Sequence, residues 1–145
     1  MTDDSDGYRR ASLSDLETNP DKPGRRWEVS PQLGMTDYNY NVAELDPGTR
    51  LSRNAYHYHE DQREFYHVVA GRCRVEVEDG AFVLGTDEFC HFDAGVPHLL
   101  HNPYDEVCRI VAVGAPPEGR HPVHRVQSYE DLIDERYDGD VPTDD

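Results

Sequence analysis

Between residues 37 and 114 the chain is a succession of short β-type runs separated by glycine, proline and aspartate turns. The clearest run, residues 73–78, alternates apolar and charged side chains and ends at Asp79-Gly80, a pair typical of tight hairpins. Further runs cover residues 81–84, 88–92 and 107–113, and each ends within three residues of a glycine. No long segment with the hydrophobic periodicity of a helix lies between these runs, so the sequence predicts an all-β antiparallel sandwich or barrel.

The two ends of the chain have a different character. Residues 1–25 are polar and acidic without a sustained period, which predicts a mobile N-terminal arm. Residues 26–115 are then expected to form one barrel domain, a size that can bury a core. Residues 116–145 form an extension with one short helix expected near 128–136, where Ser128 can cap the first turn.

The charge balance excludes several classes of partner. The chain has 14 basic and 30 acidic residues, a formal net charge of −16, so it repels phosphate backbones and anionic membrane surfaces. We therefore expect no nucleic-acid or membrane partner. No apolar run approaches the roughly 18 residues of a membrane span, and the first residues lack the features of a secretory signal. A cytoplasmic location is the resulting expectation.

The basic residues are unusually distributed, since Lys22 is the only lysine and the other 13 are arginines. An acidic, lysine-poor surface resembles that of proteins from salt-loving microbes, because molar salt shortens the Debye length to about 3 Å and screens self-repulsion. We interpret the chain as halophilic. The alternative is an acidic mesophile protein with charged tails.

The three cysteines, Cys73, Cys90 and Cys108, form no C-x-x-C pair, which argues against a disulfide framework or a thiolate zinc site. Strand alternation places Cys73 and Cys108 toward the barrel interior, whereas the face of Cys90 is open. We interpret all three as structural thiols.

The histidines suggest a metal site. In His57-Tyr58-His59 the two imidazoles are two residues apart, so in a strand they share one face. Glu64 joins that face only if a turn intervenes, for which residues 60–62 supply polar candidates. His98 follows the turn 95–97. An H-x-H pair alone lies more often at a surface or an interface than at a metal ion. The metal-site hypothesis therefore depends on all of these residues together.

In that arrangement the sequence resembles the cupin superfamily. The first cupin motif corresponds to Gly48, His57, His59, Glu64 and Gly71, and the second to Gly85, Gly95, His98 and Asn102. The loops between Gly48 and His57 and between Gly85 and Gly95 are longer than the pattern, and Asp93 occupies its usual proline position. The resemblance implies a double-stranded β-helix, the cupin jelly-roll barrel, usually as a homodimer.

The resemblance further implies that His57, His59, Glu64 and His98 bind one divalent transition metal ion. Imidazoles and a carboxylate suit iron, manganese, nickel, copper or zinc, and the ligand types do not choose among them. Tyr66 shares the face of Glu64 by strand parity. It is either a catalytic residue that donates a proton or orients a substrate, or an ordinary barrel tyrosine.

Other polar residues are assigned away from the metal. We expect surface or subunit-contact positions for His67, His91 and His101, and no relation to the site for His121 and His124. Asn102 is expected to fix a loop by hydrogen bonding. Arg50 and Arg53 either bind an anionic substrate or lie in a solvated loop.

Two functions remain in competition. The first is a small metalloenzyme, of dioxygenase, isomerase or lyase type, that acts on a small oxygen-bearing substrate at the three-His/one-Glu site. The second is a non-catalytic module that binds or senses a sugar or metabolite. The complete ligand set favours the enzyme, although the fold alone does not select a reaction.

Overall fold

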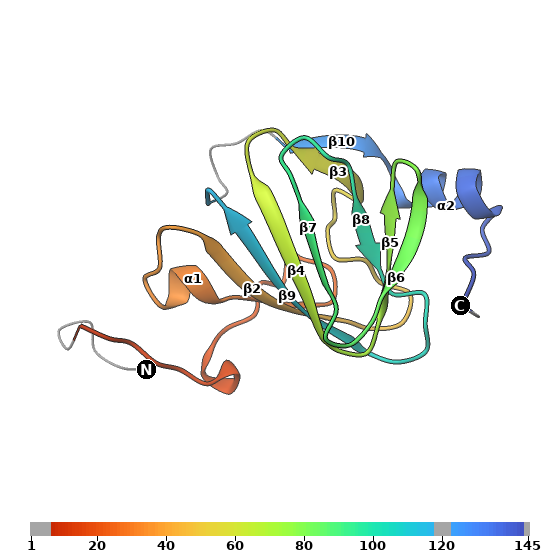
Figure 1. Ribbon diagram of the computed structural model, residues 1–145. Coiled ribbons are helices and arrows are strands. Elements are labelled where there is room, and N and C mark those ends of the chain that lie inside the picture. The colour runs from red at the N-terminus through yellow and green to blue at the C-terminus, as the bar shows by residue number, and fades with distance from the viewer. Residues whose placement is uncertain (1–6, 118–122, 144–145) are drawn as a thin grey trace.

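The computed structural model describes residues 7–117 and 123–143 (Figure 1). The short helix η2 (Leu13–Asp15) precedes the first strand, and the short helix α1 (Val29–Gln32) follows it. The longer helix α2 (Tyr129–Tyr137) follows the last strand. The strands are β1 (Arg25–Glu28), β2 (Asn39–Leu45), β3 (Tyr56–His59), β4 (Arg63–Ala70), β5 (Cys73–Val77), β6 (Gly80–Leu84), β7 (Phe89–Phe92), β8 (Leu99–His101), β9 (Cys108–Ala115) and β10 (Val123–Gln127). The predicted all-β architecture is confirmed.

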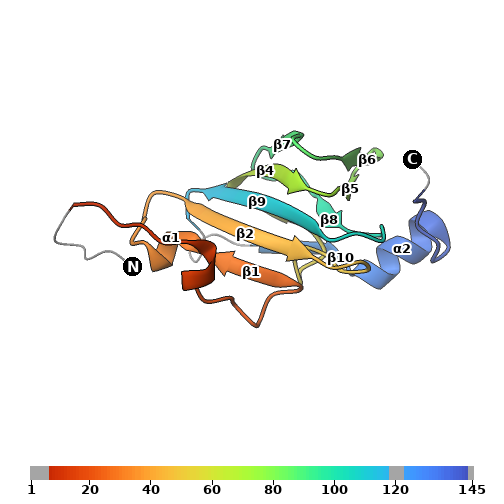
Figure 2. The same cartoon turned by 90° about the horizontal axis from the view of Figure 1, so that it is seen from below.

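The strands form three antiparallel sheets. A five-stranded sheet has the order β1-β2-β9-β4-β7, a three-stranded sheet has the order β6-β5-β8, and β10 pairs with β3. In Figures 1 and 2 the sheets enclose a common interior, with α2 outside the three-stranded sheet at one end. Sequence analysis did not anticipate β10, which brings the C-terminal extension back onto the barrel along β3.

The core follows from strand alternation. In the five-stranded sheet, Ala43, Ile110 and Val68 lie side by side in register, and all three are fully buried. Cys73 and Cys108 are also fully buried, while Cys90 is partly buried and packs against the same cluster. A hydrogen bond with Cys108, together with burial, raises the pKa of the Cys73 thiol well above its usual value. The predicted inward orientation of Cys73 and Cys108 is therefore confirmed.

Gly71 shows why the first motif ends in glycine. The residue adopts φ +77°, which L side chains rarely adopt, and a Cβ there would lie 2.5 Å from the carbonyl oxygen of Val107. The turn between β4 and β5 can therefore pass close to the start of β9 only with glycine at this position.

Helix α2 begins where the sequence predicted. The side chain of Ser128 accepts a hydrogen bond from the backbone N–H of Asp131, and Glu130 and Asp131 place negative charge in the first turn. Leu132 and Ile133 pack against Tyr56 and Leu99 in a second apolar cluster outside the barrel. The helix therefore covers the outer side of β3 and β8.

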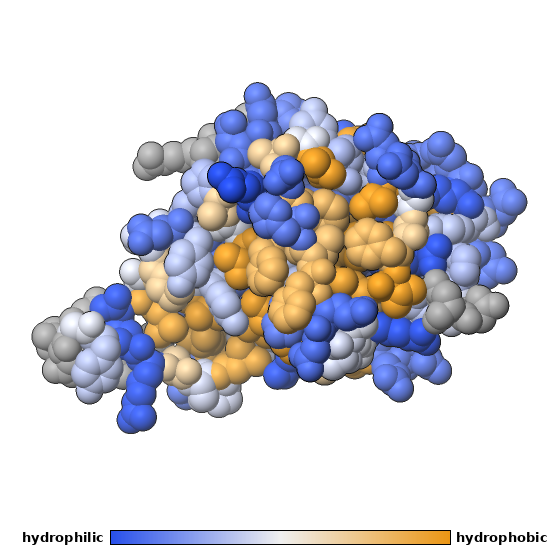
Figure 3. Space-filling model, in the orientation of Figure 1, coloured by the Kyte–Doolittle hydropathy of each residue, from blue (hydrophilic) through white to orange (hydrophobic). Residues whose placement is uncertain are grey.

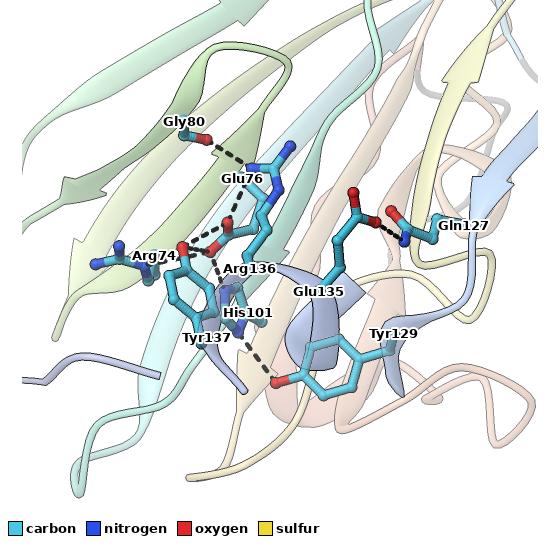
Figure 4. Close-up of polar contacts among 9 residues, drawn as sticks. All are labelled: Arg74, Glu76, Gly80, His101, Gln127, Tyr129, Glu135, Arg136 and Tyr137. Atoms are coloured by element: carbon cyan, nitrogen blue, oxygen red, sulfur yellow. Dashed lines mark hydrogen bonds and ion pairs between the residues drawn. The ribbon is translucent and has the colours of Figure 1, made fainter. Parts of the chain in front are cut away.

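A buried polar cluster lies under the same helix (Figure 4). Glu76 and His101 are both fully buried, and Nε2 of His101 lies 2.9 Å from Oε2 of Glu76. Tyr137 and Arg136 of α2 donate hydrogen bonds to Glu76 over 2.7 and 3.1 Å, and Arg74 adds a bond over 3.2 Å. The expectation that His101 is a surface or subunit-contact residue was wrong, because α2 covers this face of β8.

The described part of the N-terminal region makes contacts with the first strand. Thr18 bridges to Trp27, and the backbone N–H of Asn19 donates to the carbonyl of Arg26 over 2.8 Å. The mobility of residues 1–25 stays a prediction. Among residues 7–117 and 123–143 no helix is long and apolar enough to cross a membrane.

Candidate metal centre

Two backbone hydrogen bonds place the two histidine motifs side by side. The N–H of His57 donates to the carbonyl of His98 over 3.2 Å, and the N–H of His98 donates to the carbonyl of His57 over 2.9 Å. The rings of the two residues consequently lie 5.0 Å apart between centroids. His59 shares the face of His57, with ring centroids 5.1 Å apart, and all three histidines are buried.

Glu64 reaches this group from the start of β4. Residues 60–62 form the predicted break between β3 and β4, so Glu64 points inward with Tyr66 and Val68 rather than outward. Its Oε1 lies 2.9 Å from Nε2 of His59 and 3.0 Å from Nε2 of His98. The parity argument made from the sequence is confirmed at this position.

The outer nitrogens of two rings are held by backbone carbonyls. Nδ1 of His57 lies 2.7 Å from the carbonyl oxygen of Ala55, and Nδ1 of His98 lies 2.9 Å from that of Val96. A carbonyl can only accept, so Nδ1 carries the proton in the neutral imidazole and Nε2 presents its lone pair. This is the tautomer and the support that a histidine needs to ligate a metal through Nε2.

The environment keeps these groups in the protonation states that metal binding needs. Burial, reinforced by the neighbouring His98, lowers the pKa of His57 to about 4, so this imidazole is neutral near pH 7. Burial alone would raise the pKa of Glu64, but interactions with the nearby imidazoles of His59 and His98 outweigh it and hold the pKa well below its usual value. A neutral imidazole beside a carboxylate is a suitable pair of ligands for a divalent cation.

The residues present therefore fit a metal ion. The ligand atoms of His57, Glu64 and His98 lie within 4.8 Å of one another. His59 lies outside this tight group of three, but its Nε2 touches the same carboxylate oxygen. That oxygen, Oε1 of Glu64, is buried and has no well-aligned hydrogen bond in the described structure, which leaves it suited to a cation.

Two aromatic residues complete the inner wall. The hydroxyl of Tyr66 donates to Oε2 of Glu64 and lies 3.3 Å from Nε2 of His98. Phe92 stacks on the ring of His98, with centroids 4.2 Å apart and planes 10° apart. Sequence analysis identified Tyr66 but missed Phe92, although Phe92 is in register with Glu64 across β4 and β7.

The candidate metal site lies in a cavity of about 90 Å³ that opens to solvent. Besides the four candidate ligands and Tyr66, the polar residues that line it are Lys22, Arg26, Asn39, Asn41, Ser52, Asn54 and Gln62. Arg50 and Arg53, which the sequence suggested as anion-binding residues, are not among its lining residues. Arg50 instead lies over the ring of Tyr129, at 5.3 Å from its centroid.

The remaining histidines lie elsewhere. His67 approaches Asp87, and His91 approaches Asp93, both on the outer side of the barrel. His124 pairs with Glu60 and stacks on Tyr58, away from the candidate ligands. His121 lies outside the described residues.

Asn102 has the loop-fixing role that the sequence predicted. Its amide donates to the carbonyls of Leu45 and Glu106 over 2.8 and 2.7 Å and accepts from the N–H of Tyr104 over 3.0 Å.

Three sheets around one interior, with an inward cluster of histidines and a glutamate, define a β-barrel protein of the kind that binds small molecules inside the barrel. Residues 41–114 match the cupin domain family. The chain belongs to the cupin superfamily, and its fold is the double-stranded β-helix expected from the sequence.

Individual relatives point to several activities. The chain is 30% identical over 105 residues to polyketide synthase CurC of Streptomyces cyaneus, covering 71% of this chain and 66%, about two thirds, of that protein. The structure of a sugar phosphate isomerase of the cupin superfamily from Silicibacter pomeroyi has a TM-score of 0.73 at 20% identity, covering 82% of each chain. The polyketide cyclase RemF from Streptomyces resistomycificus has a TM-score of 0.69 at 21% identity, covering 87% of this chain and 90% of RemF. The two structural matches show a shared fold.

Proposed function

We propose that this protein is a metal-dependent cupin enzyme whose single divalent ion is held by His57, His59, Glu64 and His98. The observation that carries the proposal is the carboxylate of Glu64, buried between the Nε2 atoms of His59 and His98 with one oxygen lacking a well-aligned hydrogen bond. A divalent ion bound there would polarise the oxygens of a bound carbonyl compound as a Lewis acid.

Tyr66 supports the carboxylate from the interior side. Because its hydroxyl donates to Oε2 of Glu64, it turns Oε1 toward the imidazoles and restrains the carboxylate plane. The phenol is buried and lines the cavity, so it also holds a proton close to any ligand there. We propose a positioning role for Tyr66, with proton donation to the substrate as its catalytic role.

The substrate class we favour is a compound with several carbonyl groups in 1,3 relationship, as in a polyketide chain. A curated relative is named a polyketide synthase and a structural neighbour a polyketide cyclase. Ring closure of such a chain needs no oxidant. A C–H between two carbonyls gives up its proton, a C–C bond forms to another carbonyl carbon, and that oxygen takes up the proton. The second hydrogen of the attacking carbon then leaves together with the new hydroxyl group as water.

Metal analysis with one matched pair of variants tests the site. Protein loaded with zinc, manganese or nickel should retain close to one ion per chain, and His98→Ala should lose most of it. His67→Ala, which removes a histidine on the outer face of β4, should keep the ion. Equal retention in both variants would contradict the assigned site.

An activity screen tests the reaction. Incubation with a synthetic β-tetraketone, whose attacking carbon can close a six-membered ring, should give a ring-closed product lighter by one water, and metal removal should abolish its formation. A protein that holds the ion yet transforms no candidate substrate would instead fit a non-catalytic binding module.

We also propose that the protein is a homodimer. The outer face of β4 and β7 exposes Phe65 and Phe89, which stack with centroids 6.0 Å apart, and Phe89 is 58% exposed. Figure 3 shows apolar side chains gathered across the middle of this side of the molecule. A second copy is the favoured occupant, because an isologous contact would cover the exposed rings of Phe65 and Phe89 on both chains at once.

Sedimentation analysis tests the dimer. Phe89→Ser should shift the protein toward monomer, while Tyr8→Ser, which removes a ring that is 61% exposed in the N-terminal region, should leave the mass unchanged. A monomeric wild-type protein would contradict the proposal.

A further inference from the structure

Two positively charged side chains line the cavity of the candidate metal site, although the protein is strongly acidic. Lys22, the only lysine of the chain, and Arg26 both line the cavity that contains the candidate ligands. No sequence motif marked either residue, because both precede the cupin motifs. Their position raises the question of what the two positive charges recognise.

Arg26 points to the interior because of its register. On β1 it pairs with Ala43, which is fully buried on the inner face of β2, so Arg26 shares that face. Only 8% of Arg26 is exposed, and its Nη2 donates to the carbonyl of Leu51 over 2.6 Å. This bond fixes the guanidinium, whose forked donors suit a carboxylate. The neighbouring Arg25 faces outward and pairs with Glu44 and Asp46.

Lys22 adds a second charge at the same wall. Within residues 7–117 and 123–143 its ammonium makes no ion pair with a carboxylate, although the chain has 30 acidic residues. A cation kept apart from so many acids, at a cavity, is available to a ligand. The amides of Asn39, Asn41 and Asn54 line the same space and contribute further donors.

The sheet register gives the separation of the two ends of the cavity. Glu64 and Asn39 lie in one row across β4, β9 and β2, and Arg26 lies one strand further and four residues along, opposite Ala43. Flat-sheet spacing would give about 14 Å across the strands and about 13 Å along them, which barrel curvature and inward side chains shorten. A two-carbon acid is too short to join these ends.

We infer that Lys22 and Arg26 form an anion subsite that binds the carboxylate of an extended, oxygen-rich substrate whose other end lies at the metal centre. The inference rests on the proposed function and specifies its substrate as an acid. Arg26 acts as a specificity-determining residue, since it distinguishes a carboxylate from the uncharged amide of the same shape.

A charge-matched ligand pair tests the inference. Zinc-loaded protein is titrated calorimetrically with 3,4-dihydroxyphenylpropionate and with its primary amide, which share the catechol and differ in charge. Wild-type protein should bind the acid at least about tenfold more tightly than the amide. Arg26→Gln should bring the two dissociation constants within about twofold, with amide binding and zinc content unchanged. Arg25→Gln, the outward-facing neighbour, should keep the wild-type ratio.

Lys22→Gln provides an independent variant if Arg26→Gln fails to fold, as judged by circular dichroism. It should lower the acid-to-amide preference at least about threefold. Equal binding of acid and amide by the wild type, no binding of either, or an unchanged preference in the folded variants would overturn the inference. If the wild type takes up no zinc, the proposed metal centre fails, and the same ratio measured on zinc-free protein still decides the anion subsite.

Discussion

The carboxylate of Glu76 is expected to be a principal attachment of helix α2 to the barrel, and Glu76→Gln tests this. The side chain is fully buried, and the polar side chains around it in Figure 4 donate to its carboxylate. Tyr137 donates to both of its oxygens over 2.7 and 2.9 Å, while His101, Arg136 and Arg74 approach within 2.9–3.2 Å. An amide of the same shape removes the negative charge and turns an –NH₂ group toward these donors.

The magnitude follows from the kind of interaction that is lost. Removing one partner of a buried ion pair costs about 3–5 kcal/mol, because the remaining charge stays buried without compensation. Arg136 and Arg74 keep some solvent access, with side chains 23% and 11% exposed, which places the expected loss at the lower end, about 3 kcal/mol. Urea unfolding at neutral pH measures it, with Glu78→Gln as the control on the exposed end of the same hairpin.

The pH dependence has a definite sign. Burial alone would raise the pKa of Glu76, but hydrogen bonds from His101, Tyr137 and Arg136 outweigh it and hold the pKa below its usual value of 4.5. The resulting stabilisation is present above that value and is lost as the pH falls through the lower folded-state pKa. Glu76→Gln should therefore flatten the acid limb of the stability profile. A variant within about 0.5 kcal/mol of wild type, with an unchanged acid limb, would refute the reasoning.

Three further predictions concern the rest of the molecule. With a net charge of −16, the melting temperature should rise from low to molar potassium chloride, and a melting temperature indifferent to salt would contradict the halophilic interpretation. Cys73→Ser and Cys108→Ser should each lower the free energy of unfolding by about 1–3 kcal/mol, since each buries a hydroxyl, while metal content stays unchanged. Tyr66→Phe should retain the metal but lower turnover by about 10²-fold or more if the phenol supplies a proton, as steady-state assays would show.

Much of the inner face could be predicted because it depends only on strand parity and turns. The break at residues 60–62 was sufficient to place Glu64 on the side of His59, and the structure has it there. Parity also placed Tyr66 on the face of Glu64, and the structure buries it there. These assignments need no knowledge of the partner strands, because each side chain within a strand can point to only one of two faces.

The cations of the cavity could not be predicted in the same way. Arg25 and Arg26 are identical in type and adjacent, and only the pairing of β1 with β2 decides which one faces the interior. That pairing joins residues far apart in sequence, and nothing in the local pattern fixes its register. Arg50 and Arg53 were candidates for binding an anionic substrate because they lie close in sequence to His57, yet they are not among the residues that line the cavity.

His98 and His101 show where parity stops being informative. They lie at opposite sides of one short strand segment, and both are almost completely buried, at 2% and 0% exposure. Their odd spacing in sequence is consistent with opposite sides, but it does not say what covers each side. The interior covers His98 and leaves its Nε2 to the candidate metal centre, whereas α2, a helix from the far end of the chain, covers His101 and supplies Tyr129 as a partner beside Glu76. Two residues of one type therefore acquire separate roles from tertiary packing, one at the candidate site and one in the attachment of the helix.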